Sequence, residues 1–121
     1  MISIHIETIP HKEQRYETVG DWWIAPDAKW QIRVSRMNNW KYELCVALHE
    51  LVEMALCYVA DVPQEVIDEF DMHYDGSQIE PGDDRHAPYH KQHCVATGVE
   101  RIMAALLGVK WADYDNAVNA L

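Results

Sequence analysis

The chain has 121 residues, 49% of them hydrophobic and 25% charged, and this composition predicts one compact globular domain spanning residues 1–121. A chain of this length buries roughly two thirds of the surface that its unfolded form exposes, so it needs no disulfide or metal to hold a core. Twenty acidic residues against ten basic ones give a formal charge of −10. That charge argues against a nucleic acid or an anionic membrane surface as the partner, because both are negatively charged.

The expected cellular location follows from segments that the sequence lacks. No stretch approaches the roughly 18–20 consecutive apolar residues of a membrane span, and residues 1–7 lack the basic segment of a secretion signal. The three cysteines, Cys45, Cys57 and Cys94, are odd in number and have apolar neighbours, which favours buried thiols in a reducing compartment. We therefore expect a cytoplasmic protein.

Residues 1–36 have the patterns of strands and turns. Ile2, Ile4 and Ile6 alternate with polar residues and Pro10 follows, which predicts a half-buried first strand. Residues 15–19 and 22–25 are short β-type runs on either side of a turn signal at Gly20-Asp21. Residues 30–35 alternate again. These runs predict a small antiparallel sheet.

From residue 40 onward the sequence is mainly helical. Asn38-Asn39 is a helix N-cap signal before a mostly apolar helix over 40–59, and Pro63 begins a short acidic helix that extends to about residue 73. Pro88 begins a second long helix, which Gly108 closes, and a short amphipathic helix follows over 111–121. We therefore predict an α+β fold in which the small N-terminal sheet packs against the buried helix 40–59, beside the second long helix and the short ones.

Three ionisable residues lie inside the apolar helix 40–59. His49 and Glu53 are four residues apart, so they lie one turn apart on the same side of the helix, with Glu50 beside them. Buried ionisable groups are costly without a partner, and no Lys or Arg occurs between Lys41 and Arg85 to supply one locally. This arrangement favours a divalent metal ion, although a polar stripe paired with basic residues of the sheet is the alternative.

The segment Ala47-Leu48-His49-Glu50-Leu51 resembles the active-site helix of zincin-type metallopeptidases, which carries an HExxH motif after a strand at the sheet edge. The resemblance covers residues 30–58, and Glu53 stands where the family has its second histidine. It implies that His49 and Glu53 bind a divalent ion, Zn²⁺ first, with Mn²⁺ or Fe²⁺ as alternatives. It also implies Glu50 as the general base in metal-assisted hydrolysis of a peptide or protein substrate.

The second long helix offers candidates for a third ligand. His90, His93 and Glu100 lie on one stripe of that helix, and His93 and Glu100 are closer to its apolar residues. We predict that His93 completes the site, with His90 as a further candidate ligand or a residue that orients substrate. Glu100 is either an alternative ligand, a partner behind the ligands or an ion-pair partner of Arg101. Solvent-exposed histidines are the remaining interpretation.

Two other classes of function stay open. Glu50 and Glu53, followed by Glu65 and Asp68, resemble the ExxE and ExxD motifs of all-α nucleoside triphosphate pyrophosphohydrolases, a resemblance that implies Mg²⁺. The chain could instead be a non-catalytic acidic adaptor that binds a basic protein, with a degenerate metal site or none. Nine acids and no Lys or Arg in residues 61–84 form either a solvated loop or a flap that favours basic substrates or partners.

Overall fold

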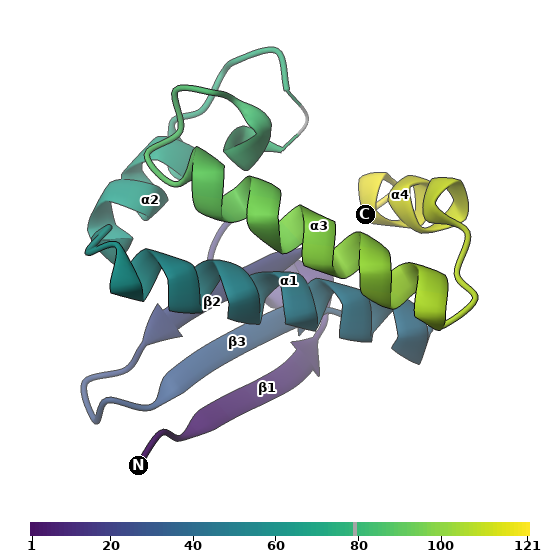
Figure 1. Ribbon diagram of the computed structural model, residues 1–121, viewed down its shortest axis with the longest axis horizontal. Coiled ribbons are helices and arrows are strands. Elements are labelled where there is room, and N and C mark those ends of the chain that lie inside the picture. The colour runs from purple at the N-terminus through teal and green to yellow at the C-terminus, as the bar shows by residue number, and fades with distance from the viewer. Residues whose placement is uncertain (79) are drawn as a thin grey trace.

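A computed structural model describes residues 1–78 and 80–121 and shows the predicted α+β architecture, a small sheet with helices on one side (Figure 1). The strands are β1 (Ile4–Ile9), β2 (Gly20–Ile24) and β3 (Trp30–Ser35). The α-helices are α1 (Trp40–Val59), α2 (Gln64–Met72), α3 (His90–Leu106) and α4 (Trp111–Asn119). Two single-turn 3₁₀ helices, η1 (His11–Glu13) and η2 (Pro81–Asp83), lie in the connections.

The prediction of a wholly antiparallel sheet is wrong. The strand order is β1-β3-β2, in which β2 and β3 form an antiparallel pair while β1 runs parallel to β3. β1 is parallel because the segment 10–19 crosses the end of β3 to the far edge of the sheet before β2 begins. His11 and Gln14 fix this crossing by hydrogen bonds of 2.8 and 3.0 Å to the hydroxyl of the buried Ser35.

The second predicted strand also differs. Residues 15–19 form bends rather than a strand, and Gly20-Asp21, predicted as a turn, begins β2 instead. The buried Asp21 accepts two hydrogen bonds from Arg15, at 2.6 and 2.9 Å, and the pairing of residues 20–24 with β3 outweighs the local turn preference of the dipeptide. Arg15 also pairs with Asp68 in α2, at 3.2 Å, while Gly20 at the start of β2 lies against Glu50 of α1.

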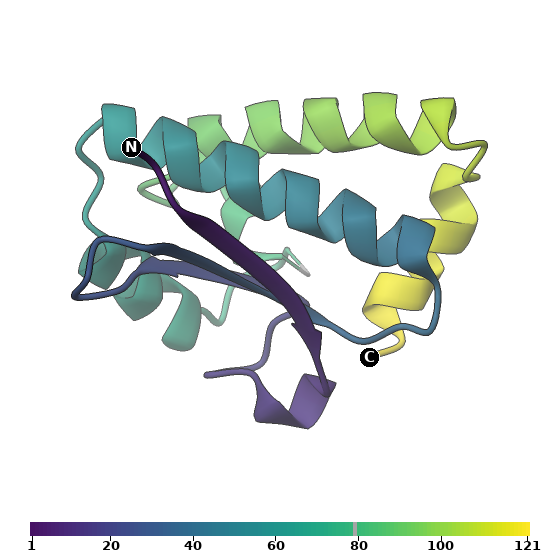
Figure 2. The same ribbon diagram turned by 90° about the horizontal axis from the view of Figure 1, so that it is seen from below.

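The two long helices, α1 and α3, lie together on one face of the sheet (Figure 2). α1 packs against β2 and β3, and α3 lies beside α1 rather than on the sheet. The two helices run antiparallel, since the Lys41 ammonium at the start of α1 donates to the Leu107 carbonyl just after α3, at 3.2 Å. α1 is buried toward the sheet and α3, but Trp40, Tyr58 and Val59 are exposed, so it is less enclosed than its apolar sequence suggested.

The helix boundaries largely agree with the sequence signals. The Asn39 side chain accepts hydrogen bonds from the backbone N–H groups of Lys41 and Tyr42, which confirms the N-cap of α1. Gly108 follows α3 with a φ of 72°, a backbone conformation that favours glycine. α3 begins at His90 rather than Pro88, because residues 87–89 form a turn.

Two smaller expectations can also be compared with the structure. Cys45 and Cys57 are buried as expected, whereas Cys94 is exposed on α3. Among residues 1–78 and 80–121, no helix combines the length and the apolar character that crossing a membrane requires.

Candidate metal centre

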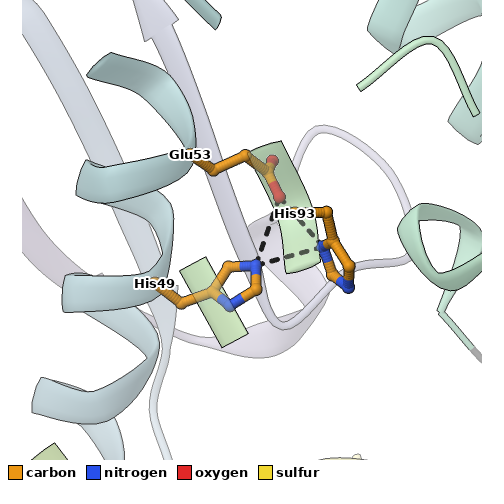
Figure 3. A group of neighbouring side chains, drawn as sticks. All are labelled: His49, Glu53 and His93. Atoms are coloured by element: carbon orange, nitrogen blue, oxygen red, sulfur yellow. Dashed lines mark hydrogen bonds and ion pairs between the residues drawn. The ribbon is translucent and has the colours of Figure 1, made fainter. Parts of the chain in front are cut away.

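The side chains of His49, Glu53 and His93 meet between α1 and α3 (Figure 3). His49 and Glu53 come from consecutive turns of α1, and His93 comes from the first turn of α3. The Nε2 atom of His49 lies 3.2 Å from the Nδ1 atom of His93 and 3.2 Å from Glu53 Oε2. Glu53 Oε2 lies 3.0 Å from the same Nδ1 atom of His93. All three side chains are buried.

These separations fit one small cation. Zn–N and Zn–O bonds of about 2.0–2.1 Å at tetrahedral angles place neighbouring ligand atoms about 3.3 Å apart. The three observed separations, 3.0–3.2 Å, are slightly shorter and thus suit three ligands on one side of an ion. Two imidazoles and one carboxylate are the donor set of His₂Glu zinc sites and also of facial iron(II) sites, both of which keep open positions.

The second ring nitrogen of His49, Nδ1, makes a hydrogen bond on the side away from the cluster. Its Nδ1–H donates to Glu100 Oε1 at 2.7 Å, and the hydroxyl of the buried Tyr114 donates to the second oxygen of Glu100. Glu100 thus lies behind a candidate ligand, one of the roles that the sequence left open for it. A carboxylate in this position fixes the tautomer and the orientation of a metal-binding histidine.

The other two side chains of the cluster are supported in the same way. His93 Nε2–H lies 3.0 Å from Asp83 Oδ1 and 3.3 Å from Glu80 Oε2, both in the segment around η2. Glu53 Oε1 accepts a hydrogen bond of 3.1 Å from the indole N–H of Trp22 in β2. Each of the three candidate ligands therefore presents one atom to the centre of the cluster while a neighbour holds its other polar atom.

The hydrogen-bond partners also show that the centre of the cluster is short of positive charge. With their outer nitrogens donating to carboxylates, neutral His49 and His93 both direct lone pairs inward, toward the oxygen of Glu53. Three electron pairs then face each other without a hydrogen between them. Only additional protons or a metal ion satisfy such a centre.

The pKa directions agree with this accounting. Burial lowers the pKa of His93, but hydrogen bonds with Glu53 and Glu80 outweigh it and raise the pKa to about 10. For His49, burial is likewise outweighed by Glu100 and Glu53, which hold its pKa well above the usual range. Burial raises the pKa of Glu53, yet the hydrogen bonds from both imidazoles lower it to about 2. The surrounding carboxylates therefore favour positive charge in the cluster, and a metal ion would have to displace the additional proton from both rings.

Glu50 lies beside the cluster with a different environment. Its carboxylate packs over Gly20 in β2, so closely that a Cβ atom on Gly20 would lie 2.6 Å from Glu50 Oε1. Burial and then the negative charge of Glu53 raise the pKa of Glu50 well above its usual range. Glu50 also lines a pocket of about 600 Å³ that reaches His49, Glu53 and His93, a volume typical of small-molecule sites. A buried carboxyl of raised pKa at a pocket wall is suited to proton transfer.

The structure does not bring every candidate residue into the cluster. His90 points elsewhere: its Nδ1 atom lies 2.9 Å from the Gly82 carbonyl, and Cys94 Sγ lies 3.5 Å from its Nε2 atom. His90 therefore anchors the η2 segment that supports His93 instead of acting as a ligand in this group. Of the ExxE and ExxD carboxylates, Asp68 lines the pocket with Glu50 and Glu53, whereas Glu65 is exposed on α2 outside it.

Several residues of the site had not been identified from the sequence. Trp22 lies in a short β-type run and Tyr114 in the short amphipathic helix, where an aromatic residue is ordinary, and Glu80 and Asp83 belong to the acidic segment 61–84. Only the contact with His93 distinguishes these two acids from their neighbours. A hydrogen-bonding tip on a buried aromatic is the one general signal available, since a buried indole or phenol needs a partner.

We compared the chain with protein-family models, with curated proteins and with solved structures, and none of the three comparisons finds a match. The candidate function therefore depends on the residues and the geometry described above.

Proposed function

We propose that this protein is a metal-dependent hydrolase related in mechanism to zincin-type peptidases, with His49, Glu53 and His93 as the metal ligands. The supporting observation is the convergence of their three ligand atoms within 3.0–3.2 Å while Glu100, Trp22 and Asp83 hold the outer atoms. Without a metal ion, protons on both imidazoles satisfy the centre, and a divalent ion would replace these protons as the positive charge between the three side chains. The donor set favours Zn²⁺, with Mn²⁺ or Fe²⁺ as alternatives.

A divalent ion in such a centre polarises a substrate carbonyl and lowers the pKa of water, which is the chemistry of amide hydrolysis at neutral pH. In the proposed reaction Glu50 accepts a proton from the attacking water and later donates it to the leaving amine. Its burial beside Gly20 and its raised pKa favour the donating step. For the accepting step the carboxyl must be ionised, which the positive charge of a bound metal ion would favour. Glu100 and Asp83 keep the rings of His49 and His93 in place throughout the reaction.

The test begins with metal content. Protein purified without an affinity tag should contain close to one Zn, Mn or Fe per chain by plasma mass spectrometry, either as isolated or after supplementation. The His49→Ala and Glu53→Ala variants, checked for folding by circular dichroism, should lose it. His73→Ala is the matched control, since His73 is exposed at the end of α2 and should leave the metal content unchanged. A folded wild-type chain that takes up none of these metals would contradict the proposal.

The catalytic assignment needs a second measurement. Glu50→Gln should retain the metal but lose most of its turnover on any peptide that a fluorogenic library identifies as a substrate. General acid–base groups typically contribute about 10²–10⁴-fold to the rate. Unchanged turnover in this variant would show that Glu50 is not the base. A metal-bearing chain that hydrolyses nothing in the library would favour a non-catalytic metal-binding module instead.

A further inference from the structure

The pocket beside the candidate metal centre is lined by an unusual number of carboxylates. Apart from the candidate ligand Glu53, the side chains of Glu50 and Glu100, and the two acids that hold His93, its lining includes five more acids, namely Glu17, Asp21, Asp68, Asp71 and Asp115. Among the described residues, Arg101 is the one Lys or Arg in the lining, and its guanidinium stacks over the Trp111 ring, 4.3 Å from the centroid. The pocket is therefore strongly electronegative.

The protein neutralises only part of this charge. Arg15 pairs with both Asp21 and Asp68, with N–O distances of 2.6 and 3.2 Å. Asp71 instead accepts hydrogen bonds from the hydroxyls of Tyr16 and Tyr89, which carry no charge. Among the described residues, the two hydroxyls that donate to Asp71 are neutral, so its negative charge is not balanced by these contacts.

Glu50 independently indicates a missing partner. It is only 9% exposed, and within residues 1–78 and 80–121 its carboxylate accepts no hydrogen bond. It belongs to the wall of the same pocket, where Gly20 leaves room for its oxygens. Because its oxygens border the pocket and no described donor holds them, a hydrogen-bond donor that enters the pocket can pair with this side chain.

Glu50 and Asp71 line the same pocket together with Tyr16. The Tyr16 hydroxyl donates to Asp71 at 3.2 Å, and Asp21 lines the pocket as well. The Arg15 guanidinium lies over the Tyr16 ring, 5.9 Å from its centroid, but it is paired with Asp21 and Asp68, so among the described residues the charge of Asp71 is left for a ligand. Coulomb attraction there favours positive charge, and it is stronger than in bulk water because the walls are partly buried.

We propose that the pocket selects substrates with a positively charged nitrogen, either an ammonium or a guanidinium group, which binds on the side of Asp71 and Tyr16. This inference rests on the proposed function, since it names the substrate class of the same site. The charged nitrogen could be a basic side chain or a free amino terminus, both of which offer the same donors and charge. Anionic substrates are repelled by the same carboxylates.

Isothermal titration calorimetry on the metal-loaded full-length chain tests this with two matched pairs of probes. The first pair, N-acetyl-lysine amide and N-acetyl-norleucine amide, differs in the charge of the side chain. The second pair, alaninamide and N-acetyl-alaninamide, differs in the charge of the amino terminus. The cationic member of at least one pair should bind about tenfold more tightly than its neutral partner, and added salt should shrink this preference. Equal binding within both pairs would overturn the inference.

The variant Asp71→Asn should reduce the preference to about threefold or less, because it removes the charge and keeps the shape. Glu65→Gln is the control, since it removes a carboxylate from the exposed side of the same helix and should leave the preference unchanged. If Asp71→Asn does not fold, Asp68→Asn serves as the second variant, because Asp68 lines the same pocket. If the folded variant, Asp71→Asn or Asp68→Asn, keeps the full preference for the cationic probes, the charged nitrogen does not bind in this pocket.

Metal content measured on the same samples separates this inference from the proposed function. A chain that holds metal but shows no preference for cationic probes overturns the substrate class alone. A chain that takes up no metal yet keeps the preference overturns the proposed hydrolase and supports the ligand class.

Discussion

At the residue scale, we expect the groups that hold the candidate ligands to affect metal binding. The Tyr114 hydroxyl donates to Glu100, which in turn accepts the Nδ1–H of His49. Tyr114→Phe should weaken metal binding about tenfold, the lower end of the range for such supporting groups. It should also cost about 1–2 kcal/mol of unfolding free energy, because the buried Glu100 loses a donor. Competition with a chelator of known affinity measures the first effect and urea unfolding the second.

Tyr42→Phe is the control for this substitution. The Tyr42 ring lies 5.5 Å from that of Tyr114, so the variant removes a neighbouring hydroxyl without touching Glu100. Metal affinity should stay within about twofold of the wild-type value. Equal losses in the two variants would mean that the hydroxyl of Tyr114 has no special role in holding His49.

A second residue-scale prediction concerns Asp71 and pH. Burial raises the pKa of Asp71 to about 6, against the opposing hydrogen bond from Tyr89. The unfolded chain has a value of about 3.9 for aspartate, so between these values the folded state binds more protons and stability falls as pH rises. About 2 kcal/mol should be lost between about pH 4 and 6 through this group, after allowing for its partial exposure. Asp71→Asn should remove that loss.

Urea unfolding of metal-free protein at pH 4.5 and pH 7 measures the difference. The quantity to compare is the free energy of unfolding of Asp71→Asn minus that of the wild type. This difference should be more positive at pH 7 than at pH 4.5. Asp27→Asn, a change at an exposed aspartate in the turn after β2, should keep the wild-type pH dependence. If Asp71→Asn also keeps the wild-type pH dependence of stability, the pKa of Asp71 is the same in the folded and the unfolded chain.

At the element scale, the approach of α1 to β2 depends on a glycine. A Cβ atom at position 20 would lie 2.6 Å from Glu50 Oε1 and 2.7 Å from Glu50 Cγ, so Gly20→Ala must displace the Glu50 side chain or move the strand. We expect a loss of about 1–3 kcal/mol of unfolding free energy, as for other overpacked sites. Turnover should fall together with stability, since the proposed base is displaced.

Gly98→Ala is the opposite case on α3, where no atom lies within 4 Å of an added Cβ. Alanine in a helix interior is favoured over glycine by about 1 kcal/mol, so this variant should be more stable than the wild type. Thermal unfolding of the two variants side by side gives the comparison. A stable, active Gly20→Ala protein would show that α1 and β2 can separate without affecting the site.

At the scale of the whole molecule, metal binding should stabilise the fold because the cluster joins α1 to α3. A ligand that binds only the folded state at 100 times its Kd adds about 2.7 kcal/mol, which corresponds to a rise of roughly 10 °C in Tm for a chain of this size. Zn²⁺ added to metal-free protein should produce this rise, and a chelator should reverse it. Glu53→Ala should show none, and a similar rise in that variant would indicate metal bound elsewhere.

Much of the fold can be read from local patterns. The spacing of apolar residues and the signals at Asn39 and Gly108 predict the helices to within two residues, because caps and periodicity depend on neighbours along the chain. The pairing of β1 with β3 could not be predicted in this way. It depends on a ten-residue crossing held by His11, Gln14 and Ser35, contacts between residues more than twenty positions apart.

In the candidate site, too, some features follow from local sequence and others from the packing of separate elements. The sequence by itself determined that His49 and Glu53 lie on one side of a helix with Glu50 beside them, since helical geometry fixes residues four apart. Only the tertiary structure decided between His90, His93 and Glu100, because the rotation of α3 against α1 directs His93 inward, turns His90 toward Gly82 and places Glu100 behind His49. It also decided that Trp22, Asp83 and Tyr114 support the cluster, since each lies far along the chain from the side chain it contacts or supports. Helix periodicity acts over a few residues, whereas the choice and support of ligands depend on how separate elements pack.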